Sequence, residues 1–470
     1  MYLRTFFDEK LAQYSYMIGC QRTGEALVID PARDVTPYIE TAKKEGFHLA
    51  AAAETHIHAD FVSGARQLAE KHDVKLYLSD EGDQDSKYEY LEGLNVDLVK
   101  DGSIIKVGNI ELKVMHTPGH TPESISFMLT DLGGGSEVPM GVFTGDFVFV
   151  GDIGRPDLLE KSAGQEGTAE KGAKDMFKSL QKFKELPEFL MVWPGHGAGS
   201  ACGKSLGAVP QSTVGYELRN NWALKEENEE AFQKELLNEQ PEPPTYFSVM
   251  KKVNKEGPAV LTGEELQKVT NADEFKAFAE QENTTIVDTR PATDFAEGHI
   301  EGAINLPYNK AFTNWSGWVL DYDKDLVLIA KDEMKDEVVK SLHSIGIDNI
   351  KAYASPELLS QWNDLEGYTF ISTEELKDVY EKEDVYVVDI RKENEFNEGH
   401  IPGAGHHMLG YIEDQVEDIP EDKTLVVHCQ SGTRSAIGTS LLQSLGFKDI
   451  LNYSGGFAAW EKEGDKIEKE

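Results

Sequence analysis

The sequence predicts an α/β protein of several domains, and three observations support this fold class. The chain has 470 residues, more than a single hydrophobic core usually organises. Short apolar runs alternate with polar, helix-like segments, which is the pattern of sheets covered by helices. A segment of about a hundred residues also recurs in the second half, so part of the chain is duplicated.

Residues 1–240 form the first predicted domain, because many short apolar strands and polar helices alternate within them. The predicted strands are 14–20, 25–29, 49–53, 74–78, 104–107, 111–114, 124–129, 141–144 and 189–193, and the predicted helices include 37–46 and 174–182. The stretch 239–244 contains three prolines, which end any preceding helix. Residues 241–258 are therefore predicted to be a linker.

Two tandem copies of one domain, residues 259–366 and 367–470, follow the linker. Ile-Val-Asp-Thr-Arg at 286–290 recurs as Val-Val-Asp-Ile-Arg at 387–391, and a Glu-Gly-His-Ile turn recurs with the same shift of 101 positions (389 minus 288). Each copy continues with a second buried strand, a helix and a last strand. This order predicts a doubly wound parallel sheet in each copy.

A cysteine loop joins a buried strand to a helix in the second copy. Cys429 follows the strand 425–428 and precedes the helical segment 436–445, where backbone N–H groups and the helix dipole favour a thiolate. We predict that Cys429 carries sulfur as a persulfide. Four residues separate Cys429 from Arg434, a shorter loop than that of the cysteine phosphatases, which favours sulfur over phosphate. The residues expected to hold the anion are Gln430, Ser431, Gly432, Thr433 and Arg434.

The first copy has Ala330 where the second has Cys429. A methyl group has no nucleophilic chemistry, so this copy is predicted to be catalytically silent. We expect it to have a structural role between the flanking domains, and a role in dimerisation is the weaker alternative.

Polar residues collect at the ends of apolar strands in the first domain. A His-x-His-x-Asp turn follows the strand 49–53, and a Thr-Pro-Gly-His turn follows another. Two further strands end near an aspartate and a histidine. The candidate metal ligands are His56, His58, Asp60, His120, Asp146 and His196. Together they predict a metal site at one edge of the sheet.

These motifs resemble those of two families. The first domain resembles the metallo-β-lactamase superfamily, whose αββα sandwich carries an HxHxDH signature, although Phe61 replaces its last histidine. The two later copies resemble rhodanese domains, which carry the Asp-x-Arg strand end, the Gly-His-Ile turn, the cysteine loop and a closing Gly-Gly-x3-Trp, here 455–460. The whole order resembles that of multidomain persulfide dioxygenase and sulfurtransferase fusions of the CstB type.

The resemblance implies one ferrous ion per chain. Persulfide dioxygenases of this superfamily bind iron through residues that correspond to His56, His120 and Asp146, two imidazoles and a carboxylate suited to dioxygen chemistry. The residues expected to orient these ligands and the substrate are His58, Asp60 and His196. Because a phenyl ring cannot bind a metal, Phe61 disfavours a second ion.

Two further residues are candidates for substrate chemistry. Arg155 lies in a Gly-Arg-Pro-Asp motif similar to the Gly-Arg-Thr-Asp of that family, and we expect it to pair with an anionic persulfide or carboxylate. Cys202 lies on the glycine-rich loop after His196 and is either a thiol relay or a spectator.

The predicted function is the oxidation of low-molecular-weight thiol persulfides by O2 to sulfite, coupled to sulfur transfer that releases thiosulfate and free thiol in sulfide detoxification. The thiol is left open among glutathione, coenzyme A, bacillithiol and inorganic persulfide, and the resemblance leads us to expect a homo-oligomer. Two alternatives stay open. One is a zinc-dependent thioester hydrolase like glyoxalase II, and the other is a non-oxidative sulfur carrier or sensor scaffold.

Composition limits the partners and the compartment. There are 84 acidic and 46 basic side chains, and the net charge of −38 argues against nucleic acid or an anionic membrane as partner. No apolar run approaches the length of a membrane span and the N-terminus lacks a signal-peptide pattern, so we expect a cytoplasmic protein. Cys20, Cys202 and Cys429 are too few for a disulfide framework.

Overall fold

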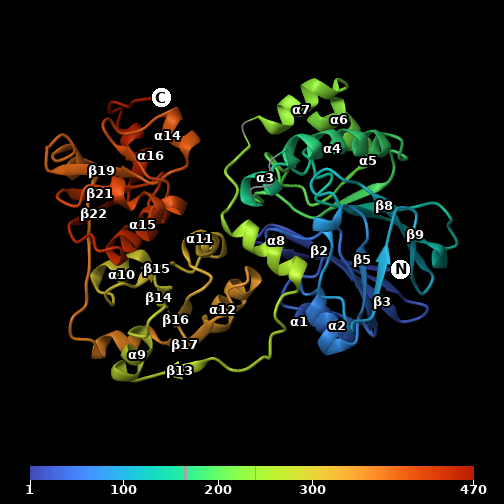
Figure 1. The fold of residues 1–470 in the computed structure, drawn as a ribbon, viewed down its shortest axis with the longest axis horizontal. Coiled ribbons are helices and arrows are strands. Elements are labelled where there is room, and N and C mark those ends of the chain that lie inside the picture. The colour runs from blue at the N-terminus through green and yellow to red at the C-terminus, as the bar shows by residue number, and fades with distance from the viewer. Residues whose placement is uncertain (164–166, 239, 470) are drawn as a thin grey trace. The chain divides into compact units, whose positions relative to one another are not determined.

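The computed structural model describes residues 1–163, 167–238 and 240–469. They divide into two compact units, Met1–Gly263 with His343–Gly346, and Glu264–Leu342 with Ile347–Glu470. Figure 1 colours the first unit mainly blue to green and the second yellow to red. Among the described residues, no helix combines the length and the apolar character needed to cross a membrane.

Two six-stranded sheets pack face to face in the first unit. The strands of one sheet are, in order, β1 (Tyr2–Asp8), β2 (Gln13–Cys20), β3 (Glu25–Ile29), β4 (His48–Ala53), β5 (Lys75–Ser79) and β6 (Val96–Val99). Those of the other are β12 (Ser212–Thr213), β11 (Met191–Pro194), β10 (Gly141–Gly145), β9 (Ile125–Asp131), β8 (Ile110–His116) and β7 (Ile104–Val107). Buried side chains from both sheets form one core cluster. This arrangement confirms the predicted sandwich.

Helices cover the outer faces of the two sheets, and β3 shows why its sequence is apolar throughout. Leu27 and Ile29 join the cluster between the sheets, whereas Ala26 and Val28 join the cluster that includes α1 (Thr36–Glu45) and α2 (Ala65–His72). Successive side chains of a strand point to opposite faces, so a strand buried on both faces must be apolar at every position. On the other sheet, α4 (Thr168–Lys184), α5 (Val214–Asn220), α6 (Trp222–Lys225) and α7 (Glu229–Leu237) contribute to a third cluster.

Two strands, β1 and β6, lack the apolar pattern that identifies the other strands, because they lie at the edges of the sheet. β1 begins the first sheet and β6 ends it, so each has only one neighbouring strand. None of the residues of β1 is fully buried, and Leu98 of β6 is half exposed. Edge strands carry polar residues on their free side, which hides the alternation that identifies inner strands.

Two five-stranded parallel sheets make up the second unit. The first has the order β13 (Gln267–Val269), β17 (Ile350–Ala354), β16 (Asp325–Ile329), β14 (Thr284–Asp288) and β15 (Ile304–Asn305). The second has the order β18 (Thr369–Phe370), β22 (Ile450–Tyr453), β21 (Thr424–His428), β19 (Val385–Asp389) and β20 (Gly405–His406). All their pairings are parallel and the two orders match strand for strand, so the predicted duplication is confirmed.

Helices lie in the connections between these strands. Those of the first copy are α9 (Ala272–Ala279), α10 (Ala292–Glu297), α11 (Phe312–Val319) and α12 (Lys335–Ser344). Those of the second are α13 (Thr373–Lys377), α14 (Glu393–Glu398), α15 (Thr433–Ser444) and α16 (Gly456–Lys462). A loop of four residues, 429–432, joins β21 to α15. Cys429 therefore lies between the end of the strand and the N-terminus of the helix.

The segment 241–258, which the sequence predicts to be a linker, is helical over most of its length. It contains α8 (Tyr246–Glu256), which belongs to the first unit (Figure 1). The prolines stop before the helix, and the carbonyl oxygen of Pro244 accepts a hydrogen bond from the N–H of Phe247 in its first turn. Its buried side chains are Tyr246, Phe247, Met250 and Asn254. Glu239, the first residue of the proline-rich stretch, lies outside the described residues.

Candidate metal centre and sulfur-transfer loop

Three buried side chains from separate turns converge in the first unit. His56, His120 and Asp146 follow β4, β8 and β10, and one donor atom of each lies within 4.8 Å of the others. Oδ2 of Asp146 is 3.6 Å from Nε2 of His120 and 3.9 Å from Nε2 of His56. These separations leave room for an ion about 2 Å from each donor.

Hydrogen bonds orient both imidazoles towards this point. Nδ1 of His120 donates to the carbonyl oxygen of Arg155 at 2.9 Å, and Nδ1 of His56 lies 2.9 Å from Oγ1 of Thr55. In both residues Nε2 therefore points to the metal position. Burial lowers the pKa of His56 and of His120, so both rings are neutral and can bind a metal.

Unpartnered polar atoms show that the three residues fit an ion. Nε2 of His56 and Oδ2 of Asp146 are buried, and no described residue gives either of them a hydrogen bond. Buried polar atoms without a partner are costly, and a divalent cation between these atoms removes that cost. Two nitrogens and one carboxylate oxygen match the donor set of a non-haem iron site.

His196 connects the three residues to a second carboxylate. Its Nδ1 lies 2.8 Å from Oδ1 of Asp146, and its Nε2 lies 2.6 Å from Oδ2 of Asp60. Burial opposes the protonation of His196, but the two carboxylates outweigh it and raise the pKa of this ring well above its ordinary value. The charged ring holds Asp146 in place through the oxygen that does not face His56 and His120.

His58 is bound to Asp30, a residue that the sequence analysis did not single out. Nε2 of His58 lies 3.2 Å from Oδ1 of Asp30, whose carboxylate also accepts hydrogen bonds from the N–H and hydroxyl of Thr55. Asp30 directly follows β3, so it has the same signal as Asp146, a carboxylate at the end of a buried strand. The position of Asp30 at the end of a buried strand was a sequence signal that could have identified this residue.

Helix α8 brings a lysine to the same region. Nζ of Lys251 donates to the carbonyl oxygen of Ile57 at 3.0 Å and to Oε1 of Glu123 at 2.8 Å. Glu123 is fully buried and also accepts a hydrogen bond from the N–H of Ile57 at 3.1 Å. The three prolines at 241–244 predict a linker, so the sequence does not single out this lysine. The spacing of Tyr246, Met250 and Asn254, four residues apart, was the available signal for a helix.

We predict that Asn254→Ala destabilises the first unit and weakens metal retention. Nδ2 of Asn254 donates to the carbonyl oxygens of His58 and Phe61 at 2.9 and 2.7 Å, and its Oδ1 accepts from the N–H of Ser63 at 2.9 Å. Removing the amide leaves these buried groups unpaired, at a cost of roughly 2–4 kcal/mol. The midpoint of thermal unfolding should fall by roughly 5–10 °C. Ser248→Ala on the same helix is the control, and an unchanged midpoint and iron content in the Asn254 variant would contradict the prediction.

Arg155, which the sequence predicts to pair with an anionic persulfide or carboxylate, forms an ion pair with Asp157 of its own motif. The side chain is fully buried, and its Nε and Nη2 donate to the two carboxylate oxygens of Asp157 at 2.7 and 2.6 Å. This bidentate pair neutralises the charge inside the domain. The contribution of Arg155 to the metal centre is its backbone carbonyl, which orients His120.

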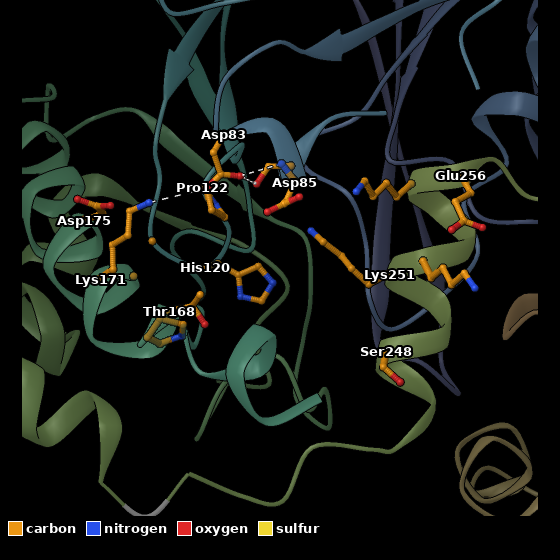
Figure 2. Close-up of a pocket in the computed structure, with 16 residues that line it drawn as sticks. Asp83, Asp85, His120, Pro122, Thr168, Lys171, Asp175, Ser248, Lys251 and Glu256 are labelled. Atoms are coloured by element: carbon orange, nitrogen blue, oxygen red, sulfur yellow. Dashed lines mark hydrogen bonds and ion pairs between the residues drawn. The ribbon is translucent and has the colours of Figure 1, made fainter. Parts of the chain in front are cut away.

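A cavity of about 250 Å³ opens beside His120. Figure 2 shows His120 between two walls, with Lys171 and Asp175 of α4 on one side and Lys251 of α8 on the other. Gly119, His120 and Pro122 line it, so the turn that holds one metal ligand forms part of its surface. The cavity therefore adjoins one of the three candidate ligands.

In the second unit, Cys429 lies at the end of β21 and just before α15. The side chain is 1% exposed, and the N–H of Gly432 donates to Sγ at 3.1 Å. Gly432 has a φ of 97°, and a Cβ there would lie 2.6 Å from the carbonyl oxygen of Ser454. The loop therefore needs glycine to bring this N–H to the sulfur.

The guanidinium of Arg434, which the sequence predicts to support the sulfur anion, is paired with a carboxylate. Its Nη1 and Nη2 lie 2.6 and 2.7 Å from the two carboxylate oxygens of Glu395. The carboxylate compensates the positive charge that the sequence analysis had assigned to the sulfur anion. Gln430 is also engaged, because its Oε1 accepts a hydrogen bond from Nη1 of Arg391 at 3.2 Å.

A cavity of about 410 Å³ adjoins the cysteine loop. It is lined by Ser431, Gly432 and Thr433 of the loop and, from the first copy, by Pro291, Ala292, Thr293, Pro307 and Asn309. The register of the sheets places Ala330 at the position of Cys429, since Ile329 pairs with Asp288 as His428 pairs with Asp389. The copy without a cysteine thus supplies one wall of the cavity beside the cysteine loop.

Comparison with known proteins agrees with this architecture. A model of the Metallo-beta-lactamase superfamily matches residues 9–196, and a model of the Rhodanese-like domain matches residues 271–355 and 372–463. The human mitochondrial persulfide dioxygenase ETHE1 is 30% identical over 197 residues, 41% of this chain and 67% of the human protein. The chain belongs to the metallo-β-lactamase superfamily. Its second half contains two rhodanese-like domains.

Two further proteins are similar to this member of the metallo-β-lactamase superfamily. A hydroxyacylglutathione hydrolase from Nitrobacter hamburgensis is 30% identical over 274 residues, 55% of this chain and 92% of that protein. The crystal structure of a metallo-beta-lactamase from Staphylococcus aureus subsp. aureus COL is 47% identical, with a TM-score of 0.68, and covers 76% of this chain and 99% of that one. The second match reaches beyond the first unit and supports the fused architecture.

This superfamily member also has a second group of buried donors, Asp60, His196 and Cys202. Nε2 of His196 and Oδ2 of Asp60 are 2.6 Å apart, closer than the roughly 3 Å that separates two donors bound to one ion. Burial, followed by the charge of Asp60, raises the pKa of the Cys202 thiol well above its ordinary value. Phe61 packs against His58, with 4.4 Å between the ring centroids, and offers no donor. These contacts favour an ion pair in this group.

Proposed function

We propose that the chain is a persulfide dioxygenase coupled to a sulfurtransferase. The observation that carries the proposal is the convergence of His56, His120 and Asp146, with buried donor atoms that no described residue satisfies. The similarity to a persulfide dioxygenase supports the substrate class. In the first reaction, a thiol persulfide, O2 and water give the free thiol and sulfite, with release of two protons.

One ferrous ion per chain, held by His56, His120 and Asp146, would supply the redox chemistry that activates dioxygen. The chain's other residues keep this donor set in position. His196 fixes Asp146, and the carbonyl oxygen of Arg155 fixes His120. His56, His120 and Asp146 are buried, and His120 also lines the cavity beside it.

Cys429 carries out the second reaction in this proposal. Its thiolate attacks the outer sulfur of a second persulfide, and the sulfur–sulfur bond of that persulfide breaks. The departing thiolate takes up the proton that the outer sulfur carried and leaves as free thiol, and Cys429 holds the transferred sulfur as a persulfide anion. Sulfite then attacks the sulfur carried by Cys429, which forms thiosulfate and restores the thiolate. The N–H of Gly432 stabilises the negative charge on Sγ before and after each transfer.

A thioester hydrolase is the second candidate, because the Nitrobacter hydroxyacylglutathione hydrolase is similar over nearly its whole length. Such a hydrolase of the two-zinc kind needs donors for a second ion. The close contact between His196 and Asp60, together with Phe61, disfavours that site here. A sensor or carrier scaffold without metal chemistry is disfavoured by the unpartnered buried donors.

Substrate turnover with and without air separates these functions. We expect the iron-loaded chain to consume oxygen with glutathione persulfide, to produce sulfite and thiosulfate, and to be inactive without oxygen. S-lactoylglutathione should not be cleaved. Thiol release from S-lactoylglutathione under anaerobic conditions, without persulfide-dependent oxygen uptake, would establish the hydrolase instead.

A further inference from the structure

Ile57 lies between His56 and His58, and both of its peptide groups are held by side chains from other segments. Its N–H donates to Oε1 of Glu123 at 3.1 Å, and its carbonyl oxygen accepts a hydrogen bond from Nζ of Lys251 at 3.0 Å. Lys251 and Glu123 also pair with each other, since Nζ lies 2.8 Å from Oε1. The backbone next to His56 is therefore clamped by two residues that are not themselves candidate metal ligands.

Glu123 connects the turns that carry two of the three candidate ligands. It follows His120 in the turn between β8 and β9, whereas Ile57 follows His56 in the turn after β4. β4 belongs to one six-stranded sheet, and β8 and β9 belong to the other. The hydrogen bond from Ile57 to Glu123 therefore joins the two sheets beside the metal position.

The ion pair between Lys251 and Glu123 is largely shielded from water. The side chain of Glu123 is 0% exposed and that of Lys251 is 15% exposed. Loss of one partner leaves the other charge buried and uncompensated, which is strongly destabilising, so the two residues hold each other in place. Figure 2 shows Lys251 on α8, a helix that lies beyond residues 9–196, the part matched by the superfamily model. The clamp is thus an addition to the core of the fold.

We propose that Lys251 and Glu123 are positioning residues of the metal centre, which set the separation between His56 and His120. This inference rests on the metal site of the proposed function and adds two residues that do not bind the metal. Through the backbone of Ile57, the pair fixes the turn of His56 relative to the turn of His120 before an ion binds. A donor set that is already ordered binds its ion more tightly, because less conformational freedom is lost on binding.

Because the pair acts on the metal ligands, it should affect metal binding and the chemical step more than substrate affinity. Loss of a residue that supports metal ligands lowers metal affinity by about 10- to 100-fold. A displacement of reacting groups by about 1 Å can lower the rate by roughly 10²-fold. A residue with a purely structural role would lower the stability of the first unit and leave the affinity and spectrum of the bound metal unchanged.

The first test variant is Lys251→Met in the full chain, because methionine keeps much of the side-chain length and removes the charge and the hydrogen bonds. We expect iron affinity to fall by about 10-fold or more, and kcat for glutathione persulfide by roughly 10²-fold with little change in KM. The visible absorption of the Co(II)-loaded chain should shift, because it depends on the arrangement of the ligands. Lys255→Met should change none of these quantities and is the matched control, since Lys255 lies on the same helix and pairs with Glu89, whose side chain is 53% exposed.

A double variant, Lys251→Met with Glu123→Gln, keeps the inference testable if the single variant does not fold. It leaves no buried charge uncompensated, and the glutamine oxygen can still accept the N–H of Ile57, but the carbonyl oxygen of Ile57 has lost its donor. The midpoint of thermal unfolding should therefore recover, whereas iron affinity and the Co(II) absorption should remain altered. In the metal-free chain, hydrogen–deuterium exchange at Ile57 should be faster than in the unaltered protein.

Unaltered iron affinity, Co(II) absorption and kcat in the variants that lack Lys251 would overturn the inference, whether or not the unfolding midpoint falls. Failure of the unaltered chain to bind iron or cobalt would instead refute the proposed function. Exchange at Ile57 in the metal-free chain would then decide the inference by itself. Faster exchange in the double variant would support it, and unchanged exchange would overturn it.

Discussion

Replacing Cys429 by serine is expected to abolish thiosulfate formation and leave iron binding and persulfide-dependent oxygen uptake intact. Serine keeps the size of the side chain that faces the N–H of Gly432, but its hydroxyl does not attack sulfane sulfur. We expect the sulfur-transfer rate to fall by roughly 10³-fold or more.

The stoichiometry gives this prediction a second readout. When both reactions are coupled, two persulfides and one O2 yield two thiols and one thiosulfate. Without the transfer step, each O2 accounts for one thiol and one sulfite, so the thiol released per O2 should halve and sulfite should accumulate. An oxygen electrode with thiol and sulfite assays measures all three quantities. Cys20→Ser is the matched control, and a thiosulfate yield unchanged by Cys429→Ser would show that the relay is wrong.

Asp146→Ala is expected to remove the iron and all oxygen uptake. Asp146 offers one oxygen to the metal position and binds His196 through the other, so the substitution removes a ligand and releases its neighbour. A ligand lost from a three-residue site should lower iron affinity by about 10³-fold or more, beyond the 10- to 100-fold that loss of a supporting residue costs. Iron per chain, measured by elemental analysis after dialysis, should fall close to zero.

Asp60→Asn is the matched variant, because Asp60 binds the other nitrogen of the same His196. It keeps the shape of the side chain and lies outside the group formed by His56, His120 and Asp146. We expect it to retain most of its iron under saturating conditions and to lose affinity by about 10- to 100-fold. The opposite pattern, with iron lost from Asp60→Asn and kept by Asp146→Ala, would place the metal with His196 and Cys202.

The fold and the candidate metal ligands could be predicted from sequence because their signals are local. Alternating apolar residues define the inner strands, and His56, His120 and Asp146 each lie just past the end of one. β4 belongs to one sheet and β8 and β10 belong to the other, so the strand pattern locates each residue and the packing of the two sheets brings the three together. The recurrence of motifs after a shift of 101 positions is also a local signal, and it predicted the two similar domains of the second unit.

Charge partners could not be predicted because folding joins residues that are far apart in the chain. Arg434 pairs with Glu395, 39 positions away, and Lys251 with Glu123, 128 positions away. No local pattern shows which carboxylate compensates which cation. The pair of Arg155 with Asp157 is the exception, since two positions separate them and the Arg-Pro-Asp sequence already placed the partner nearby.

The most direct test of the central claim is metal reconstitution followed by oxygen uptake. The metal-free full chain is loaded anaerobically with Fe(II) or with Zn(II), the bound metal per chain is measured, and glutathione persulfide and O2 are then added. The geometry of His56, His120 and Asp146 predicts about one ion per chain and oxygen uptake with iron only. Full activity of the zinc-loaded chain, or activity that requires two ions per chain, would contradict the assignment of this site as a mononuclear iron dioxygenase.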